Sequence, residues 1–217
     1  MFDVHCEKKL TPPHIRDHHS KNLKIMNGAY KVLICLFFNI NFLICQSEYG
    51  KLMEECKEQG YFESQDCMIG KEITAFNGIT YDGRQIGNST ITNKIGVINF
   101  WFMACPPCMA ELDGLNAVVD HYEERDDIEF ISFTTDEKQD IIEGFLPFHQ
   151  FKFEIIPDAE NTILEVFRIW WGFPTTIIID KSGKIFKIFS GGVTDEEEAS
   201  KEIKSTLIRL IDECLEK

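Results

Sequence analysis

The chain has 217 residues, 44% of them apolar, and a formal net charge of −14. This apolar content is enough for an ordinary packed core and argues against general disorder. The negative charge argues against nucleic acid as a partner, since no basic patch offsets it. Eight cysteines are many for a cytosolic enzyme, so an export signal is worth looking for.

The first part of the chain has the features of a leader. Residues 1–25 contain four of the six histidines and no sustained apolar period. We expect them to be a non-native or disordered leader, with translation starting at Met26. The apolar run 32–45 then follows a basic residue, as in a secretory signal peptide. Because it is shorter than the roughly 20 residues of a membrane span, it favours a cleaved signal peptide at 26–46 over a membrane anchor. A lipid on Cys45 is a further alternative.

The remaining sequence divides into a polar extension, residues 47–70, and a domain at 71–217. The extension contains two cysteines and a short expected helix. In the domain, apolar runs of strand type alternate with amphipathic segments. We expect strands at 73–76, 79–81, 95–100, 128–133, 153–156, 175–179 and 184–190, and helices at 109–124, 137–150, 161–170 and 195–215. The dipeptide Asp82-Gly83 predicts a hairpin turn. This alternation predicts an α/β layered fold with a largely parallel centre.

The chemistry of the chain points to Cys105-Pro106-Pro107-Cys108, where a predicted strand passes into a predicted helix. A C-x-x-C motif beside a β-α-β pattern indicates a redox-active dithiol. A thiolate is the nucleophile in disulfide exchange, and a helix N-terminus stabilises negative charge. We therefore expect Cys105 to have an exposed, attacking sulfur. Cys108, one turn later, is expected to be more deeply covered and to resolve the mixed disulfide.

The two prolines of the motif affect the reduction potential. Proline suits the start of a helix, but it has no backbone N–H group. Two potential donors to the Cys105 thiolate are therefore missing. We expect a potential toward the reducing end of the range of about −270 to −120 mV found for such proteins.

Two structural interpretations of the motif compete with redox catalysis. A structural disulfide across two residues would close a very small loop and add little stability. A zinc site needs a second pair of ligands, but Cys56 and Cys67 are too far apart in sequence for a C-x-x-C pair, and His121 stands alone. We expect no metal and no cofactor.

Two segments carry a family resemblance. WFMACPPCMAELDGLN resembles the active-site segment of the TlpA/ResA-like thioredoxin family, and GFPTTIIIDKSGKI resembles its cis-proline loop and following hairpin. The resemblance covers roughly residues 70–216. It implies a thioredoxin fold with a central mixed sheet flanked by helices and an N-terminal β-hairpin extension.

The resemblance also implies roles for individual residues. Pro174 would be in cis, and the backbone at Phe173 would pair with a substrate strand. Ordinary core packing is the alternative for Phe173. Asn99 occupies the place of the buried acid of thioredoxin and cannot shuttle a proton. Glu111 matches a functional glutamate of the family and would exchange a proton with Cys108. A solvated helix residue is the alternative for Glu111.

The tryptophans are candidates for the substrate surface. Trp101 and Trp171 are our candidate substrate-binding residues, and one of Trp170 and Trp171 is expected to line the groove. Core packing is the alternative for each. The sequence departs from the family at Met103-Ala104, where a tryptophan usually precedes the first cysteine.

The resulting prediction is an extracytoplasmic, periplasmic or similarly exported thiol–disulfide oxidoreductase acting as a reductase, for instance in cytochrome c maturation. Its partners would be protein disulfides or dithiols and a membrane thiol donor of the DsbD/CcdA type. A thiol peroxidase is one alternative, but Phe102 stands where such enzymes carry a threonine that helps to bind the peroxide. A non-catalytic binding module of the same fold is the other alternative.

Overall fold

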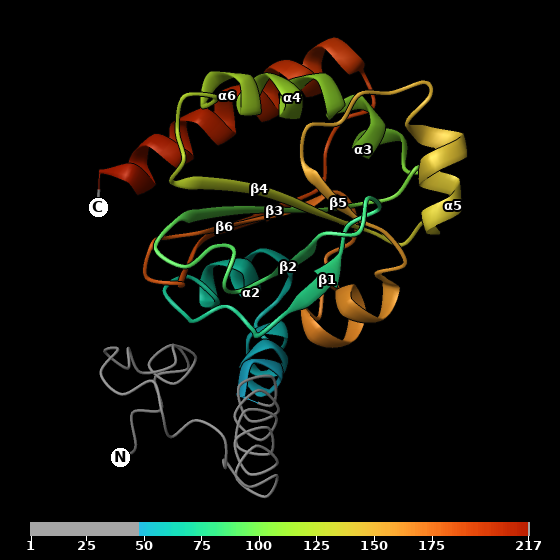
Figure 1. Cartoon of the computed structure of the whole chain (residues 1–217). Coiled ribbons are helices and arrows are strands. Elements are labelled where there is room, and N and C mark those ends of the chain that lie inside the picture. The colour runs from blue at the N-terminus through green and yellow to red at the C-terminus, as the bar shows by residue number, and fades with distance from the viewer. Residues whose placement is uncertain (1–47, 217) are drawn as a thin grey trace, which may run out of the picture.

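The computed structural model describes residues 48–216 (Figure 1). The expected leader at 1–25 and the expected signal peptide or anchor at 26–46 lie outside the described residues. Among residues 48–216, no helix combines the length and the apolar character needed to cross a bilayer.

The centre of the fold is a five-stranded mixed sheet with strand order β5-β4-β3-β6-β7. Its first three strands in space run parallel, β6 runs antiparallel to β3, and β7 runs antiparallel to β6. The strands are β3 (Ile95–Trp101), β4 (Ile128–Thr134), β5 (Glu154–Ile156), β6 (Thr175–Ile179) and β7 (Ile185–Ser190). Every residue of β3 and β6 is buried, as expected for strands covered on both faces. The expected thioredoxin-type mixed sheet is confirmed.

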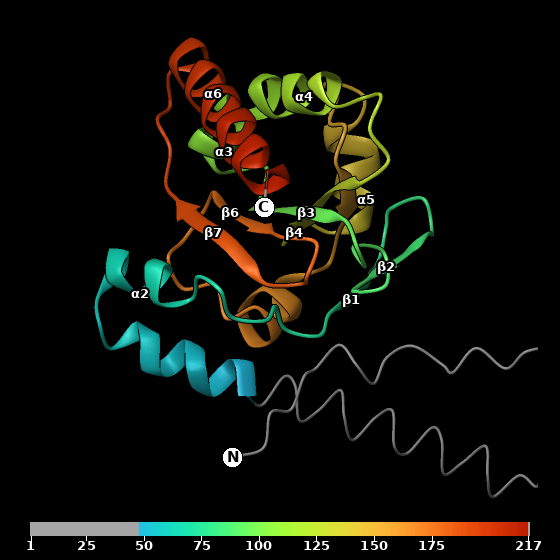
Figure 2. The same cartoon turned by 90° about the vertical axis from the view of Figure 1, so that its left-hand side faces the viewer.

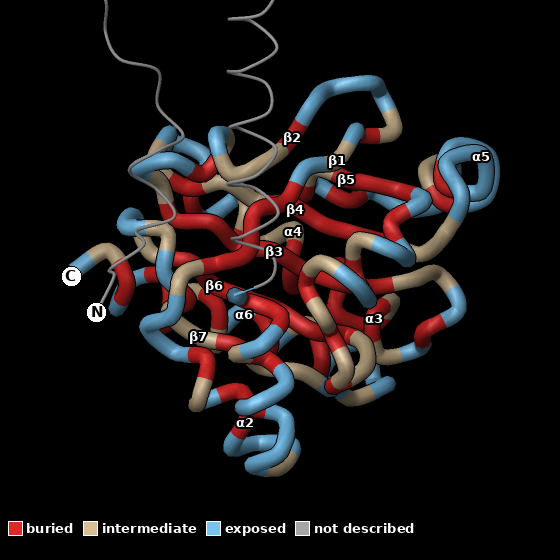
Figure 3. The backbone as a smooth tube through the Cα atoms, turned by 90° about the horizontal axis from the view of Figure 1, so that it is seen from below, coloured by how far each residue is buried: buried red, intermediate tan, exposed pale blue. Residues whose placement is uncertain are grey.

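Helices cover both faces of the sheet (Figures 1 and 2). One face is covered by α3 (Pro106–Ala110), α4 (Leu112–His121) and α6 (Glu196–Leu215). The other face is covered by the helical residues 48–57, by α2 (Tyr61–Cys67) and by the π-helical turn η2 (Thr162–Val166). The short helix α5 (Lys138–Asp140) and the π-helical turn η1 (Ile141–Phe145) follow β4. Two hydrophobic clusters result, one on each side of the sheet. Figure 3 shows that the central strands are buried along most of their length.

The N-terminal hairpin is shifted from its expected position. It consists of β1 (Asn77–Ile79) and β2 (Gln85–Gly87), and the turn between them contains Asp82-Gly83 as predicted. The predicted strand at 73–76 is wrong. Only part of its backbone bonds to other backbone, since the side chain of Asn88 accepts the N–H of Phe76 and donates to the carbonyl of Thr74.

The expected helices are shorter than their apolar periodicity suggested. The helix predicted at 109–124 is divided at Glu111 into α3 and α4. The one predicted at 137–150 ends near Leu146, because the following Pro147 has no N–H group to continue the helical hydrogen bonds. The last helix begins as expected, with the side chain of Asp195 accepting the N–H of Glu198.

Candidate active site

The register of the sheet brings three distant segments to one edge. Phe100, near the end of β3, pairs with Thr175 at the start of β6, and Thr175 pairs with Ser190 at the end of β7. The loop after β3, the loop before β6 and the loop after β7 therefore meet. These loops contain Cys105, Pro174 and the Gly191-Gly192 pair respectively.

The dithiol lies at the start of α3. Cys105 is the N-cap residue and forms a disulfide with Cys108. The Cys105 sulfur also accepts the backbone N–H of Cys108 at 3.3 Å, so the first N–H after the two prolines reaches this sulfur. Cys105 is only 4% exposed and Cys108 2%. The expectation of an exposed Cys105 sulfur is therefore wrong for this oxidised form, in which the sulfur is bonded to Cys108 and lies against the helix start.

An acidic residue holds the loop that leads into the dithiol. Oδ2 of Asp136 accepts the backbone N–H of Met103 at 2.8 Å and the hydroxyl of Thr134 at 2.6 Å. Asp136 follows β4, and its neighbour Thr134 pairs with Trp101 of β3. Asp136 was not among the residues predicted from the sequence, although an acid shortly after a strand parallel to β3 could have indicated it.

The loop opposite the dithiol contains a cis peptide bond between Phe173 and Pro174, the conformation that the family resemblance implied. The carbonyl of Pro174 accepts the N–H of Gly191 at 2.9 Å. The ring of Phe173 meets that of Phe102 edge to face, with centroids 5.2 Å apart. The cis-proline loop is thus connected both to the segment before Cys105 and to the loop after β7.

Glu111 is buried at the junction of α3 and α4, with 5% of its surface exposed. Burial, and to a smaller extent the negative charge of Glu202, raises the pKa of Glu111 to about 8. The loop after β7 contributes to this burial. A Cβ atom built on Gly192 would lie 2.7 Å from Oε1 of Glu111 and 3.5 Å from Pro107. The alternative of a solvated helix residue is therefore wrong.

The tryptophans lie deeper than expected. Trp101 is 1% exposed and packs against Phe145 and Phe151, so its assignment to the substrate surface is corrected to a core role. Trp171 is also buried, and its indole N–H donates to Ser64. Trp170 is half-buried and is the member of this pair that reaches the surface.

Asn99 lies in β3 and is 1% exposed. Its side-chain amide donates to the hydroxyl of Thr176 at 3.1 Å, which links β3 to β6. This neutral hydrogen bond satisfies the buried amide without a charged group.

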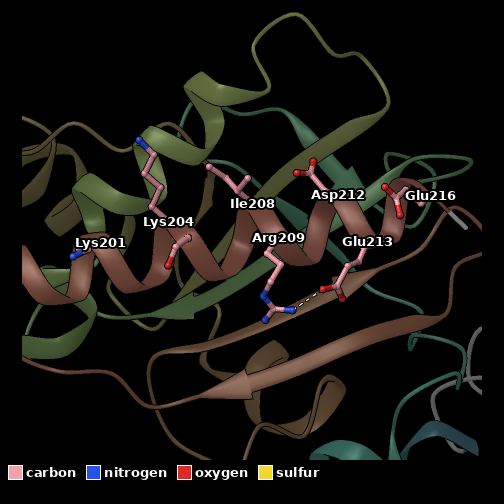
Figure 4. A pocket seen from close by; sticks show the side chains of 8 residues that line it. Lys201, Lys204, Ile208, Arg209, Asp212, Glu213 and Glu216 are labelled. Atoms are coloured by element: carbon pink, nitrogen blue, oxygen red, sulfur yellow. Dashed lines mark hydrogen bonds and ion pairs between the residues drawn. The ribbon is translucent and has the colours of Figure 1, made fainter.

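An open pocket runs along the outer face of α6 (Figure 4). Charged side chains dominate its lining, and Arg209 and Glu213 form an ion pair there. Cys105 and Cys108 are not among its lining residues. We assign it no part in the dithiol chemistry.

The model of the AhpC/TSA family matches residues 69–188, more than half of the chain. The chain belongs to the AhpC/TSA family. A curated relative, the thiol-disulfide oxidoreductase ResA of Bacillus cereus, is 31% identical over 140 residues, which are 64% of this chain and 80% of the relative. ResA of Bacillus subtilis is 24% identical over 52% of this chain and 63% of the relative. The resemblance to the ResA-like family is confirmed, and the chain is a thiol–disulfide oxidoreductase of this type.

Solved structures support the thioredoxin fold. A DsbF homologue from Corynebacterium diphtheriae matches with a TM-score of 0.53 at 22% identity, covering 65% of this chain and 85% of that one. The thioredoxin domain of a thiol-disulfide oxidoreductase from Bacteroides vulgatus matches with a TM-score of 0.50 at 21% identity. The match covers 62% of this chain and 97% of that one.

Proposed function

We propose that the chain reduces protein disulfides outside the cytoplasm through Cys105 and Cys108. The observation that carries this proposal is the position of the Cys105–Cys108 disulfide at the start of α3, at the sheet edge that also holds the cis-proline loop. A dithiol at this position can exchange with a disulfide presented beside that loop. The relatives named thiol-disulfide oxidoreductase support the same reaction class.

In the reductive direction, the Cys105 thiolate attacks one sulfur of a substrate disulfide. A mixed disulfide forms and the other substrate sulfur leaves as a thiolate. The Cys108 thiolate then attacks the Cys105 sulfur, which releases the second substrate thiolate and forms the Cys105–Cys108 disulfide. Two electrons pass to the substrate, so an external dithiol must reduce the protein again. A membrane thiol donor of the DsbD/CcdA type would supply them.

Glu111 is proposed to exchange the proton of Cys108. With a pKa of about 8, its carboxyl group is mostly protonated at neutral pH and titrates in the same range as a thiol. The minor carboxylate form can accept the Cys108 proton during resolution, and the protonated form can return a proton when the dithiol is regenerated. Asn99 has no ionisable group and cannot take this role, whereas Glu111 is three residues after Cys108 and buried.

The loop at Phe173 and Pro174 is proposed to bind the substrate. An extended peptide segment can pair with the free backbone groups of such a loop, as in other strand-addition complexes. Oxidised cytochrome c precursors are a substrate class that fits the reductase assignment. An extracytoplasmic location is supported by the apolar run at 32–45 and by the second disulfide, Cys56–Cys67, because disulfides persist in oxidising compartments.

The test is a single-turnover reaction of the fully reduced protein with insulin. We expect the loss of two protein thiols, located at Cys105 and Cys108 by mass spectrometry, for each insulin disulfide reduced. Hydrogen peroxide serves as the competing substrate for the thiol peroxidase alternative. Consumption of peroxide without insulin reduction would favour the peroxidase, and reaction with neither would favour a non-catalytic binding module.

A further inference from the structure

Three polar side chains lie on one face of helix α2, namely those of Tyr61, Ser64 and Gln65. Ser64 and Gln65 follow Tyr61 by three and four residues, and all three contact segments next to the cis-proline loop. The hydroxyl of Tyr61 donates to the carbonyl oxygen of Trp171 at 2.7 Å and lies 2.7 Å from the hydroxyl of Ser190. The amide of Gln65 donates to the same Ser190 hydroxyl at 3.0 Å. The indole of Trp171 donates to Ser64 at 2.7 Å.

These contacts reach both chain segments that flank the cis-proline. Trp171 lies three residues before Pro174 in the same loop. Ser190 pairs with Thr175, the residue after the proline, and is followed by Gly191, whose N–H donates to the carbonyl of Pro174. The Tyr61 hydroxyl therefore links Trp171, which precedes the cis-proline, to Ser190 of β7, which pairs with the residue after the cis-proline.

Helix α2 is itself held in place by other contacts. The Cys56–Cys67 disulfide connects its last residue to the preceding helical segment, where Cys56 is fully buried. Asp66 forms an ion pair with Lys187 of β7 at 3.0 Å. Helix α2 thus lies along β7, the last strand of the sheet (Figure 2). Neither the disulfide nor the ion pair involves the Tyr61 hydroxyl. Removal of this hydroxyl should therefore loosen the cis-proline loop while α2 stays in place.

We propose that Tyr61 is a positioning residue for the cis-proline loop, and that α2 thereby sets the affinity for protein disulfides. The inference rests on the proposed function, because it concerns the loop assigned to substrate binding. A peptide that pairs with an already ordered loop loses less conformational freedom on binding. A small disulfide makes no such pairing and needs access only to the sulfur atoms. Tyr61 should therefore matter for protein substrates and not for small ones.

The experiment compares Tyr61→Phe with the wild type on insulin and on dithiobis(nitrobenzoate), a small aromatic disulfide. The phenylalanine keeps the ring that meets Trp170 edge to face at 5.8 Å and loses only the hydroxyl. We expect the KM for insulin to rise about fivefold, the effect of one lost hydrogen bond, with kcat unchanged. The rate with the small disulfide should not change.

Asp66→Asn is the matched control, because it removes an exposed α2–β7 ion pair that reaches neither Trp171 nor Ser190, and the Cys56–Cys67 disulfide still holds the helix. We expect its KM for insulin to equal that of the wild type. Ser190→Ala removes the other end of the Tyr61 contact and should reproduce the rise in KM, which keeps the test valid if Tyr61→Phe fails to fold.

Three outcomes count against the assignments, and they are distinguishable. An unchanged KM in both Tyr61→Phe and Ser190→Ala would overturn the positioning role, and so would an equal loss of rate on both substrates. A wild type inactive on insulin and on the small disulfide would instead contradict the proposed function itself.

Discussion

The carboxyl group of Glu111 lies against the backbone of Gly192, so closely that a Cβ atom at residue 192 would be 2.7 Å from Oε1. Gly192 belongs to the loop after β7 and also faces Pro107 of the dithiol motif. The missing side chain thus lets this loop cover the acid and the start of α3 together. Burial of this kind is the main cause of the raised pKa of Glu111.

Replacing Gly192 by alanine tests this packing. We expect Gly192→Ala to displace the carboxyl group toward water, lower its pKa and slow insulin reduction at neutral pH about tenfold. The pH profile of insulin reduction is the measurement. Gly144→Ala is the control, because a Cβ atom there would meet nothing within 4 Å. If Gly192→Ala has the profile of the wild type, Gly192 does not position Glu111.

Replacing Glu111 by glutamine tests the proton exchange itself. The wild type should show an ionisation near pH 8 in its rate profile, since burial raises the pKa of Glu111 to about 8. Glu111→Gln cannot titrate, so this ionisation should vanish and the rate at neutral pH should fall about 100-fold, the lower end for loss of a general acid–base group. The same ionisation in both proteins would assign it to a thiol instead.

The raised pKa of Glu111 also predicts a pH dependence of stability. Between pH 4.5 and about 8 the folded protein holds the Glu111 proton more tightly than the unfolded chain does. Stability should therefore fall as the pH rises through this window, by up to about 1.4 kcal/mol per pH unit from this group. Urea unfolding of the oxidised wild type and of Glu111→Gln at pH 5 and pH 8 measures the difference. We expect the wild type to lose more stability than the variant between these pH values, and equal losses would show that Glu111 is solvated.

The prolines of the motif predict a direction for the reduction potential. Pro107 offers no N–H group near the Cys105 sulfur, and the first such group there belongs to Cys108. Pro107→Ala adds a donor that stabilises the thiolate, and hence the reduced form. We expect the potential to rise by about 30 to 60 mV, the equivalent of one hydrogen bond to a charged group. Equilibration with glutathione buffers measures it, and an unchanged or lower potential would contradict the argument.

Much of the fold could be predicted from the sequence, because the central strands are mostly apolar and the motifs are local. The run at 95–100 could be assigned to a doubly buried strand, and the position of the dithiol after it follows from the chain itself. The strand predicted at 73–76 is wrong, and the backbone of Thr74 and Phe76 bonds to the side chain of Asn88. An apolar run does not indicate which groups will form hydrogen bonds with its backbone N–H and C=O groups.

The surroundings of the dithiol were harder to predict, since they depend on contacts between distant segments. Asp136, Gly192 and Tyr61 reach the site from a strand end, a loop and the N-terminal extension. None of them stands near Cys105 in the sequence. Trp101 was misplaced for a related reason: it adjoins the motif in sequence, but its position in β3 directs it into the core beside Phe145.

The central claim is that Cys105 attacks substrate disulfides and Cys108 resolves the intermediate. The most direct measurement is mass spectrometry of the mixed disulfides that accumulate when Cys108→Ala is expressed in the native host, with Cys105→Ala as the control. Because resolution is blocked in Cys108→Ala, we expect extracytoplasmic proteins bound to Cys105, and none bound to the control. If no adduct forms on Cys105, or if both variants give the same adducts, the exchange mechanism is wrong.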